Sequence, residues 1–478
     1  MSKNHWAFLG LCLGFFLVMM DATTVPLAYT TLMDVFNLSP AEVAWVNNSY
    51  LVMYAASLLL GGRLGDFANR KNVVLCAYLI LGLGAWLSGS GQSLPAVLIG
   101  RVLMGIGAGL LTPQSMAYIS QLFGSEGRGT ALGVWGAVAG IATATGPVLT
   151  QVFLAMGDWR WIMWINIPVA LVCLLLALVS LPSAPGRGLR GQDIAMSLLY
   201  GCSLAAAIIG LEWVVADAAQ RNLGTGLLIG GLILGASLLR YELKGRHSLL
   251  LAPALWSDHC FLRTCLVSGV LGAGLTAFYL PLAFLLGVRM QLGPSAISAI
   301  MVTIALANAL VGPLSASVAT RLSLPKAVQL GLGLFALASL LIGASAIVLT
   351  QTALRVPVLM LLMALAGCGT GLAFAPLANM ALSRAEAATI GRAAAFYNSV
   401  RQLASALGGV LVALLFDGAI RLQLGLEARL SAETLREQAP TIGLACALCF
   451  IAISMLLSLG VLLMRSPARA AQLQNEGV

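Results

Sequence analysis

The sequence Gly61-Gly62-Arg63-Leu64-Gly65-Asp66-Phe67-Ala68-Asn69-Arg70-Lys71 lies between two long apolar runs and is too short to form a domain. A short basic loop between two membrane-spanning helices stays cytoplasmic. The glycines allow two helix ends to approach closely. Asp66 is placed to pair with the neighbouring cations or to face a helix N-terminus. The stretch therefore predicts a cytoplasmic turn between two spanning helices.

The composition indicates a polytopic helical membrane protein. The 478 residues are 60% hydrophobic and only 9% charged, and the mean hydropathy is +0.96. Soluble domains do not have this balance. The net charge of +9 is spread over short loops, so it indicates membrane orientation rather than nucleic-acid binding. We find no Walker loop, no metal-ligand cluster and no nucleophile with a histidine and an acid, so the sequence argues against an enzyme or a metal site.

The apolar runs predict fourteen spans of roughly 20 residues each. Their approximate limits are 6–31, 42–62, 71–91, 94–118, 129–155, 160–181, 193–215, 222–241, 263–287, 294–320, 326–349, 355–380, 393–416 and 441–464. If the N-terminus is cytoplasmic, Lys and Arg on the cytoplasmic side outnumber those outside by roughly two to one, as the positive-inside rule requires. Both termini are therefore expected in the cytoplasm.

Motifs spread over nearly the whole chain resemble those of one transporter family. The opening stretch is similar to the pattern G-x-L-a-D-r-x-G-r-k between helices 2 and 3 of the major facilitator superfamily. Further similar segments are Met20–Val25, Trp45–Leu51, Arg101–Gly107, Gly146-Pro147, Asp158–Pro168 and Gly391–Leu403. Together they resemble the fourteen-helix drug:proton antiporter branch. Phe67 and Asn69 depart from the loop pattern, and Thr150 and Gln151 replace the glycines that end the antiporter motif.

The resemblance implies an all-α polytopic membrane protein with the major facilitator fold, made of two six-helix bundles plus two inserted central helices. The expected domains are 1–181 for the first bundle, 182–262 for the linker, inserted helices and cytoplasmic loop, and 263–478 for the second bundle. The resemblance also implies a proton-coupled exporter of amphipathic organic compounds (drugs, toxins or secondary metabolites) in the bacterial inner membrane. A proton gradient would drive it, and no cofactor is expected.

Two ionisable residues lie inside predicted spans at similar depth. Asp21 lies roughly 22 Å from the inner end of the first span, and Arg101 roughly 10 Å below the outer end of the fourth, at the helical rise of about 1.5 Å per residue. A charge in the bilayer core is costly and usually marks a transport pathway. We expect the pair to switch on protonation and couple transport to protons; a static buried ion pair is the alternative.

The resemblance assigns gating to Gly62, Asp66, Arg70 and Lys71. It also implies that Gly146 and Pro147 bend helix 5 and seal the outer-facing side. Ordinary helix packing is the alternative reading for each glycine. Eight polar residues are candidates for a substrate cavity, with helix–helix hydrogen bonding equally open for each: Asn48, Tyr50, Tyr54, Gln114, Asn308, Asn379, Asn398 and Gln402.

Two other charged residues are expected to be less important. Glu212 lies near the outer end of the seventh span and is expected at the membrane interface. Arg401 lies about two turns inside the thirteenth span, close enough to snorkel toward the cytoplasm. For Arg401 we expect capping or pairing between the bundles rather than substrate contact.

Alternatives stay open for function and for partners. An importer or symporter of a small organic nutrient and a lipid translocase are possible on the same fold. An importer should lack the antiporter motif, and the altered Thr150 and Gln151 leave that reading open. The outer loop Asp417–Pro440, with leucines at 422, 426 and 430, predicts a short amphipathic helix. It is either a solvated lid or a docking site for a periplasmic adaptor and outer-membrane channel.

Overall fold

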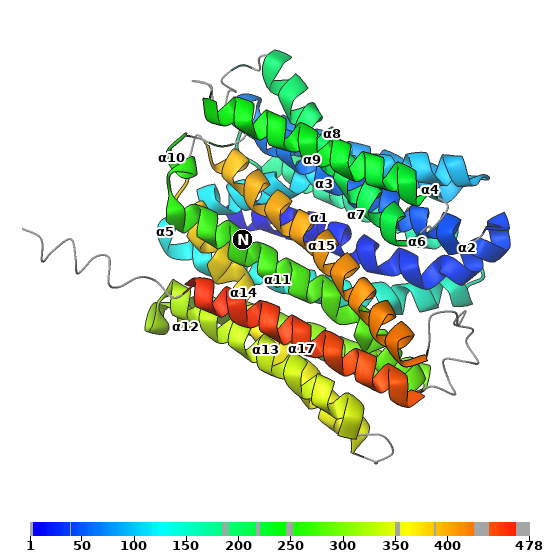
Figure 1. The fold of residues 1–478 in the computed structure, drawn as a ribbon. Helices are drawn as coiled ribbons and strands as arrows, with labels where there is room; N and C mark the ends of the chain where they lie inside the picture. Colours follow the sequence, from blue (N-terminus) through cyan, green and yellow to red (C-terminus); the bar gives the residue numbers. More distant parts are fainter. Residues whose placement is uncertain are drawn as a thin grey trace, which may run out of the picture.

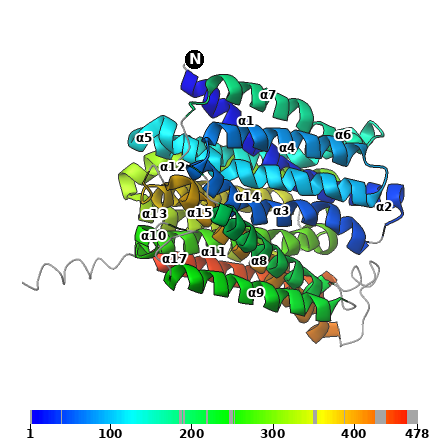
Figure 2. The ribbon, with the colours of Figure 1, turned by 90° about the horizontal axis from the view of Figure 1, so that it is seen from above.

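The computed structural model describes residues 3–38, 40–183, 188, 191–216, 220–244, 251, 253–348, 354–386, 389–424 and 439–464. These ranges contain helices and no strand. In lipid the backbone polar groups must be satisfied within each segment, and a helix does this for a long apolar run. Figures 1 and 2 show the long helices lying side by side along a common direction.

The first half of the chain forms one group of packed helices. Its elements are α1 (Lys3–Thr24), the 3-10 helix η1 (Val25–Ala28), α2 (Tyr29–Phe36), α3 (Pro40–Phe67), α4 (Arg70–Ser90), α5 (Leu94–Ala155), α6 (Arg160–Trp164) and α7 (Asn166–Ser180). α5 packs on α1, α3 and α4, and α7 packs on α1 and α4. α5 is therefore at the centre of this group.

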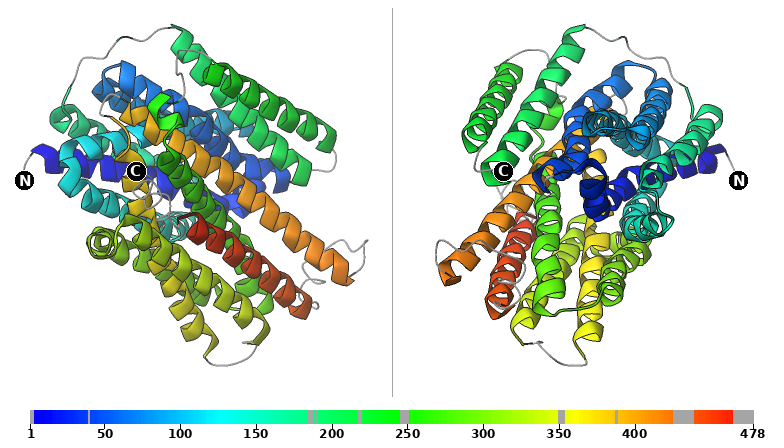
Figure 3. Two further views of the ribbon diagram at one scale, coloured as in Figure 1. Left: turned by 60° about the vertical axis from the view of Figure 1, so that its left-hand side comes forward. Right: turned by 90° about the vertical axis from the view of Figure 1, so that its right-hand side faces the viewer.

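A helical pair follows in the chain and lies on the outside of the bundle (Figure 3). It consists of α8 (Gly191–Ala216) and α9 (Arg221–Lys244). The two helices pack on each other, and α8 also contacts α3. These are the two inserted helices that the sequence predicts.

The second half forms another group. Its elements are α10 (Pro253–Trp256), α11 (His259–Phe284), the π-helix η2 (Leu285–Arg289), α12 (Pro294–Leu322), α13 (Leu324–Val348), α14 (Arg355–Leu382), α15 (Ile390–Leu424) and α17 (Ala439–Met464). The closest pairs are α11 with α15, α12 with α14, and α13 with both α14 and α17. The chain therefore contains two bundles of six long helices with the α8–α9 pair beside them.

Twelve helices in the described ranges are long and apolar enough to cross a membrane. α3 and the part of α5 after Gly124 are not among these twelve, but they pack along the spans of both halves. With them, the long helices correspond one to one to the fourteen predicted ranges. The protein is a multi-pass membrane protein.

One glycine divides α5 into two predicted spans. The backbone of Gly124 has φ +58° and ψ −160°, which breaks the helix between Leu94 and Ala155. Glycine adopts this positive φ without the steric cost that a side chain would bring. The predicted spans 94–118 and 129–155 therefore appear as two arms that meet at Gly124.

The opening motif folds differently from the predicted loop. α3 continues to Phe67 and α4 begins at Arg70, so Gly62 and Asp66 lie on the last turns of a helix. Asn69 has an extended backbone, and its side chain accepts a hydrogen bond from the Lys71 N–H at 3.1 Å. Asn69 therefore caps α4 rather than forming a left-handed turn.

The two halves are in contact at the end where α3 ends and α15 begins. We call it the predicted cytoplasmic end. There α3 contacts α15, and the second arm of α5 contacts α12 and α14. At the opposite end η1, α2 and α6 pack on their own half, and η2 packs on α11 and α17. The described state is therefore closed at the predicted cytoplasmic end.

The predicted outer loop Asp417–Pro440 is described only in part. α15 extends through Asp417 to Leu424, beyond the predicted end of the span at 416. Leu422 is 90% exposed. The predicted leucine positions 426 and 430 lie outside the described residues, so the amphipathic helix and its adaptor partner stay predictions.

Candidate functional site

The structure brings together the two charged residues that the sequence places at similar depth. Nη1 of Arg101 in α5 donates a hydrogen bond to Oδ2 of Asp21 in α1 at 2.5 Å. Asp21 is 1% exposed and Arg101 is fully buried. In such a setting the partner charge is what offsets the loss of hydration of each ion. The two residues form a buried ion pair inside the first half.

Neighbouring groups hold Arg101 in place. Its Nε donates to the backbone carbonyl of Val46 in α3 at 2.8 Å. The guanidinium lies 4.5 Å from the centre of the Tyr50 ring, and the Tyr50 hydroxyl donates to the carbonyl of Val18 in α1. Arg101 thus connects three helices. Oδ1 of Asp21 and Nη2 of Arg101 have no hydrogen-bond partner among the described groups.

The antiporter motif lies against the same stretch of α1. A Cβ added at Gly146 would collide with Oγ1 of Thr23, so only glycine allows α5 to lie this close to α1. Thr150 donates from its hydroxyl to the Thr24 carbonyl at 3.1 Å. The residue that departs from the motif therefore adds a polar contact between the two helices. Pro147 lies within α5, and its side chain is outside the described part of the structure.

Asp66 of the predicted gate connects the two halves. Its carboxylate accepts hydrogen bonds from the N–H groups of Gly391 and Arg392 at 3.0 and 2.9 Å. Arg70 and Arg392 form ion pairs with it at 3.2 and 3.5 Å. The carboxylate thus sits at the N-terminus of α15, where the helix dipole favours negative charge. Burial nevertheless raises the pKa of Asp66 above its ordinary value, against the lowering effect of these four contacts.

The other gate residues divide between the halves. A Cβ on Gly62 would clash with the backbone of Gly391, so the glycine permits α3 and α15 to touch. Lys71 instead donates to the Leu178 carbonyl in α7 at 2.6 Å, within the first half. Gly62 and Asp66 thus contact the second half directly, Arg70 pairs with Asp66 from within the first half, and Lys71 ties α4 to α7.

The predicted cavity residues of the first half form hydrogen bonds or ring contacts with other helix residues. Asn48 donates to Glu212 of α8 at 3.0 Å. Gln114 donates to the Gly61 carbonyl at 2.5 Å. Tyr54 stacks near Tyr50, with ring centres 6.2 Å apart. Asn48 therefore faces the inserted pair, and the structure does not bring these residues to one surface.

The predicted residues of the second half are also dispersed. Asn308 donates to the Thr370 hydroxyl at 2.8 Å, between α12 and α14. Asn398 donates to the carbonyl of residue 394 in its own helix, and Gln402 is half-buried on α15. Asn379 accepts a hydrogen bond from Arg128 Nε at 2.7 Å, which joins α14 to α5.

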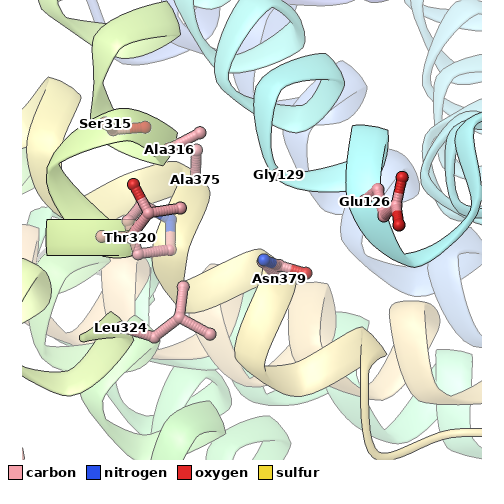
Figure 4. A pocket seen from close by; sticks show the side chains of 10 residues that line it. Glu126, Gly129, Ser315, Ala316, Thr320, Leu324, Ala375 and Asn379 are labelled. Carbon is pink, nitrogen blue, oxygen red and sulfur yellow. The ribbon is translucent and has the colours of Figure 1, made fainter.

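A cavity of about 180 Å³ lies beside Asn379 at the predicted cytoplasmic end (Figure 4). Its polar lining residues include Glu126, Ser315 and Thr320, from α5 and α12. Asn379 is the one predicted cavity residue that lines it. The cavity therefore belongs to the contact between halves.

An aromatic cluster midway along the helices was not predicted from the sequence. Phe15 of α1 stacks on Trp135 of α5 with ring centres 3.6 Å apart, and Trp135 lies near Phe374 of α14 at 6.2 Å. Arg401 of α15 completes the row, with its guanidinium 5.2 Å from the Phe374 ring centre. We call Phe15, Trp135, Phe374 and Arg401 the cross-half stack. Aromatic residues are common in spans, so their positions alone gave no signal.

No group of three or more His, Cys, Asp or Glu side chains in the described ranges is arranged to hold a metal ion.

The chain is similar along most of its length to proteins of a known family. The Major Facilitator Superfamily profile matches residues 11–409. The chain is 29% identical to the puromycin resistance protein pur8 of Streptomyces alboniger, over 87% of this chain and 82% of that one. It is 27% identical to the methyl viologen resistance protein SmvA of Salmonella typhimurium, over 86% and 83%.

Similarity extends to a transporter of another kind. The riboflavin transporter RibZ of Clostridioides difficile is 28% identical over 38% of this chain and 40% of its own length. Among solved structures, the human organic anion transporter MFSD10 matches with a TM-score of 0.66 and 18% identity, covering 97% of this chain and 100% of that one. At that identity the match shows the fold alone.

Proposed function

The chain belongs to the Major Facilitator Superfamily, whose members are transporters and not enzymes, and from this premise we propose that it exports amphipathic organic compounds in exchange for protons. The similarity to puromycin and methyl viologen resistance proteins supports export. The observation that carries proton coupling is the buried ion pair of Asp21 and Arg101.

The ion pair offers a simple chemical switch. When Asp21 is ionised, it neutralises Arg101, and both charges can stay buried. A proton on Oδ1 removes the negative charge and leaves Arg101 without its counter-charge. α1 and α5 then lose a contact that holds them together, beside the close approach of Gly146 to Thr23. Protonation therefore favours a different arrangement of these two helices.

The contacts between halves support alternating access. The described state is closed at the predicted cytoplasmic end, where Asp66 binds the first residues of α15. Opening that end has to break these contacts. A proton that changes the packing of α1 and α5 acts on the half that carries Asp66, and so shifts the balance between the two states.

The test is export in proteoliposomes under an imposed pH gradient, run in parallel with the cation ethidium and the anion 1-pyrenebutyrate as fluorescent probes, so that it does not depend on the charge of the substrate. Asp21→Asn keeps the shape of the side chain but cannot change charge. We expect it to abolish uphill export and substrate-induced proton release from the purified protein. Asp21→Glu should retain partial activity with a shifted pH optimum.

Asp34→Asn is the matched control, because Asp34 is an exposed carboxylate on the neighbouring α2. It should export at the wild-type rate. If Asp21→Asn also exported at the wild-type rate with unchanged pH dependence, the ion pair would be structural and proton coupling would have to rest elsewhere.

Import of a small organic nutrient is the second candidate, and the similarity to a riboflavin transporter favours it. The same proteoliposomes distinguish the two. An exporter moves substrate against the direction of proton flow, whereas a symporter moves both in the same direction.

The proposed organisation follows the sequence prediction. Residues 1–181 and 263–478 form the two moving bundles, and 182–262 carry the inserted pair. The protein lies in a bacterial inner membrane with both termini in the cytoplasm, which the excess of Lys and Arg on that side supports.

A further inference from the structure

Arg401 is a buried cation that forms no ion pair with a carboxylate in the part of the chain that the structure describes. It is 9% exposed and lies inside α15. Its Nη2 donates to the side-chain oxygen of Asn398 at 3.1 Å, whereas its Nε has no hydrogen-bond partner. Within the described ranges no ion pair joins Arg401 to an acid. Arg401 lies about three turns inside α15, and its guanidinium reaches back by one turn to Asn398, toward the predicted cytoplasmic end.

The cross-half stack continues from Arg401 into the other half of the protein. Phe374 lies against the guanidinium, Trp135 follows at 6.2 Å and Phe15 at 3.6 Å beyond that. The longest ring spacing is the one between Phe374 and Trp135, which belong to different halves. Trp135 also has an indole N–H without a partner. The row thus offers flat apolar faces, two free N–H donors and one positive charge.

The depth of the cross-half stack is that of a transport site. Measured from the helix ends at the predicted cytoplasmic side, Arg401 and Trp135 lie roughly 16 Å along their helices, Phe15 roughly 18 Å and Phe374 roughly 12 Å. A hydrocarbon core of about 30 Å places them near its middle. They lie above the closed gate of Asp66 and below the ion pair of Asp21 and Arg101.

The chemistry of the cross-half stack selects one class of ligand. A planar ring stacks well on Trp and Phe side chains. A guanidinium binds a carboxylate through paired, charge-assisted hydrogen bonds, and this contact is strong where water is excluded. An uncompensated cation inside a membrane protein is costly, so an anion that reaches it is favoured and a second cation is repelled. A ligand with a flat ring and a carboxylate satisfies both parts.

We propose that Arg401 and the cross-half stack recognise planar aromatic organic anions, and that these are the preferred substrate class of the transporter. The inference rests on the proposed function, since it names the compounds that the same central site carries. When the halves separate, the ligand ring enters between Trp135 and Phe374. Its carboxylate then meets the guanidinium of Arg401.

The test uses three pyrene probes that share a ring and a linker. They are 1-pyrenebutyrate, the neutral 1-pyrenebutanol and the cationic 1-pyrenebutyltrimethylammonium. Binding to the purified protein in nanodiscs is followed by energy transfer from tryptophan to pyrene. We expect the anion to bind roughly tenfold or more tightly than the cation, which is the scale of one charge-assisted contact.

Substitutions at Arg401 decide the assignment. Arg401→Gln should abolish the preference for the anion and leave the neutral probe unchanged. Arg401→Lys should keep the preference at reduced strength, because the charge stays but the planar fork is lost. Phe374→Leu should weaken all three probes alike. Arg289→Gln is the control, since Arg289 is a cation of the same half whose Nε binds the Ala346 carbonyl; it should behave as wild type.

Two outcomes would overturn the proposal. One is a wild-type protein that prefers the cationic probe. The other is an unchanged ratio between anion and cation in Arg401→Gln. Each ratio compares probes on the same sample, so a variant with a smaller folded fraction still reports it, and Arg401→Lys is the more conservative change.

The binding assay is independent of the proton-coupling test. It needs no gradient, and Asp21→Asn should retain the anion preference. If that preference exists while export ignores the pH gradient, the proposed coupling fails and the substrate class stands. If export follows the gradient but Arg401→Gln leaves selectivity intact, only the substrate class fails.

Discussion

Arg101 and Arg401 are both buried within helices, one in each half, but only Arg101 forms an ion pair within the described ranges. Arg101 forms an ion pair with Asp21 and donates to the Val46 carbonyl. Arg401 donates to the Asn398 amide and lies against the face of Phe374, and it forms no ion pair with an acid in the described ranges. The first half therefore contains a buried ion pair, and the second half contains a buried cation that pairs with no acid in the described ranges. An ion pair can act as a switch, because a proton on its acid removes the pairing. An unpaired cation can instead bind an anionic ligand.

The largest effect should come from removing each arginine in turn. Arg101→Leu leaves Asp21 buried without its counter-charge, and breaking such a pair costs about 3–5 kcal/mol. Arg401→Leu removes a charge that pairs with no acid in the described ranges, so it should be neutral or stabilising. Thermal and denaturant unfolding of the purified proteins measures the difference.

The double variant Asp21→Asn with Arg101→Leu is the control for this comparison. With both charges gone, its loss should be smaller than that of Arg101→Leu alone, because paired residues are not additive. If Arg401→Leu destabilised the protein as much as Arg101→Leu, Arg401 would have a structural partner and the contrast between the halves would be lost.

A smaller effect should come from Asp66, whose carboxylate pairs with Arg70 in its own half and, in the other half, with Arg392 and the N–H groups of Gly391 and Arg392. Its raised pKa shows that burial costs the ionised form more than these contacts return. A neutral side chain should therefore hold the closed state more firmly. We expect Asp66→Asn to slow transport roughly tenfold, equivalent to about 1.4 kcal/mol, with probe affinity changed only a few fold.

Asp258→Asn is the control for Asp66. Asp258 is a carboxylate of the same end that caps α11 within one half, so its loss should lower stability without slowing the gate. A large loss of probe affinity in Asp66→Asn with normal cycling would contradict a gating role.

The same pKa gives a pH dependence with a defined sign. An acid whose pKa is raised in the closed state binds its proton more tightly there than in the open state, where water reaches it. Lowering the pH through that raised pKa should therefore stabilise the closed state, and raising it should favour opening. Distances between spin labels on α3 and α15 can follow this. The trend should vanish in Asp66→Asn, and an opposite slope would contradict the direction.

The smallest effect should come from Glu212. This carboxylate lies beside the neutral amide of Asn48, whereas that of Asp21 lies beside the cation Arg101. Glu212 accepts a hydrogen bond from Asn48, and a glutamine oxygen can accept the same bond. We expect Glu212→Gln to change the initial rate of proton-driven export by less than about twofold. A loss as large as that of Asp21→Asn would move the coupling to the inserted helices.

Much of the fold could be predicted from the sequence. The apolar runs indicated the helices, because lipid admits few other backbone arrangements for a spanning segment. The ends of the helices were harder to predict, because single residues decide them. Asn69 caps the start of α4, and Gly124 breaks α5. The depth of Asp21 and Arg101 also followed from counting residues along a helix of fixed rise.

The partners of the polar side chains required the tertiary structure. Depth was available from the sequence, but the rotation of each helix was not, since lipid-facing and buried sides of a spanning helix are both apolar. Asn48 therefore looked like a cavity residue and instead binds Glu212. Asp66 looked like part of a loop and instead caps α15 in the other half.

By itself the sequence determined the transporter family, the helical spans and the depth of the buried charges. Only the tertiary structure decided that Arg101 has an acid beside it, and that Arg401 has Phe374, Trp135 and Phe15 in a row beyond it. The physical reason is that hydropathy and helical rise act along one chain segment, whereas a charge is balanced or left open by side chains that come from other helices.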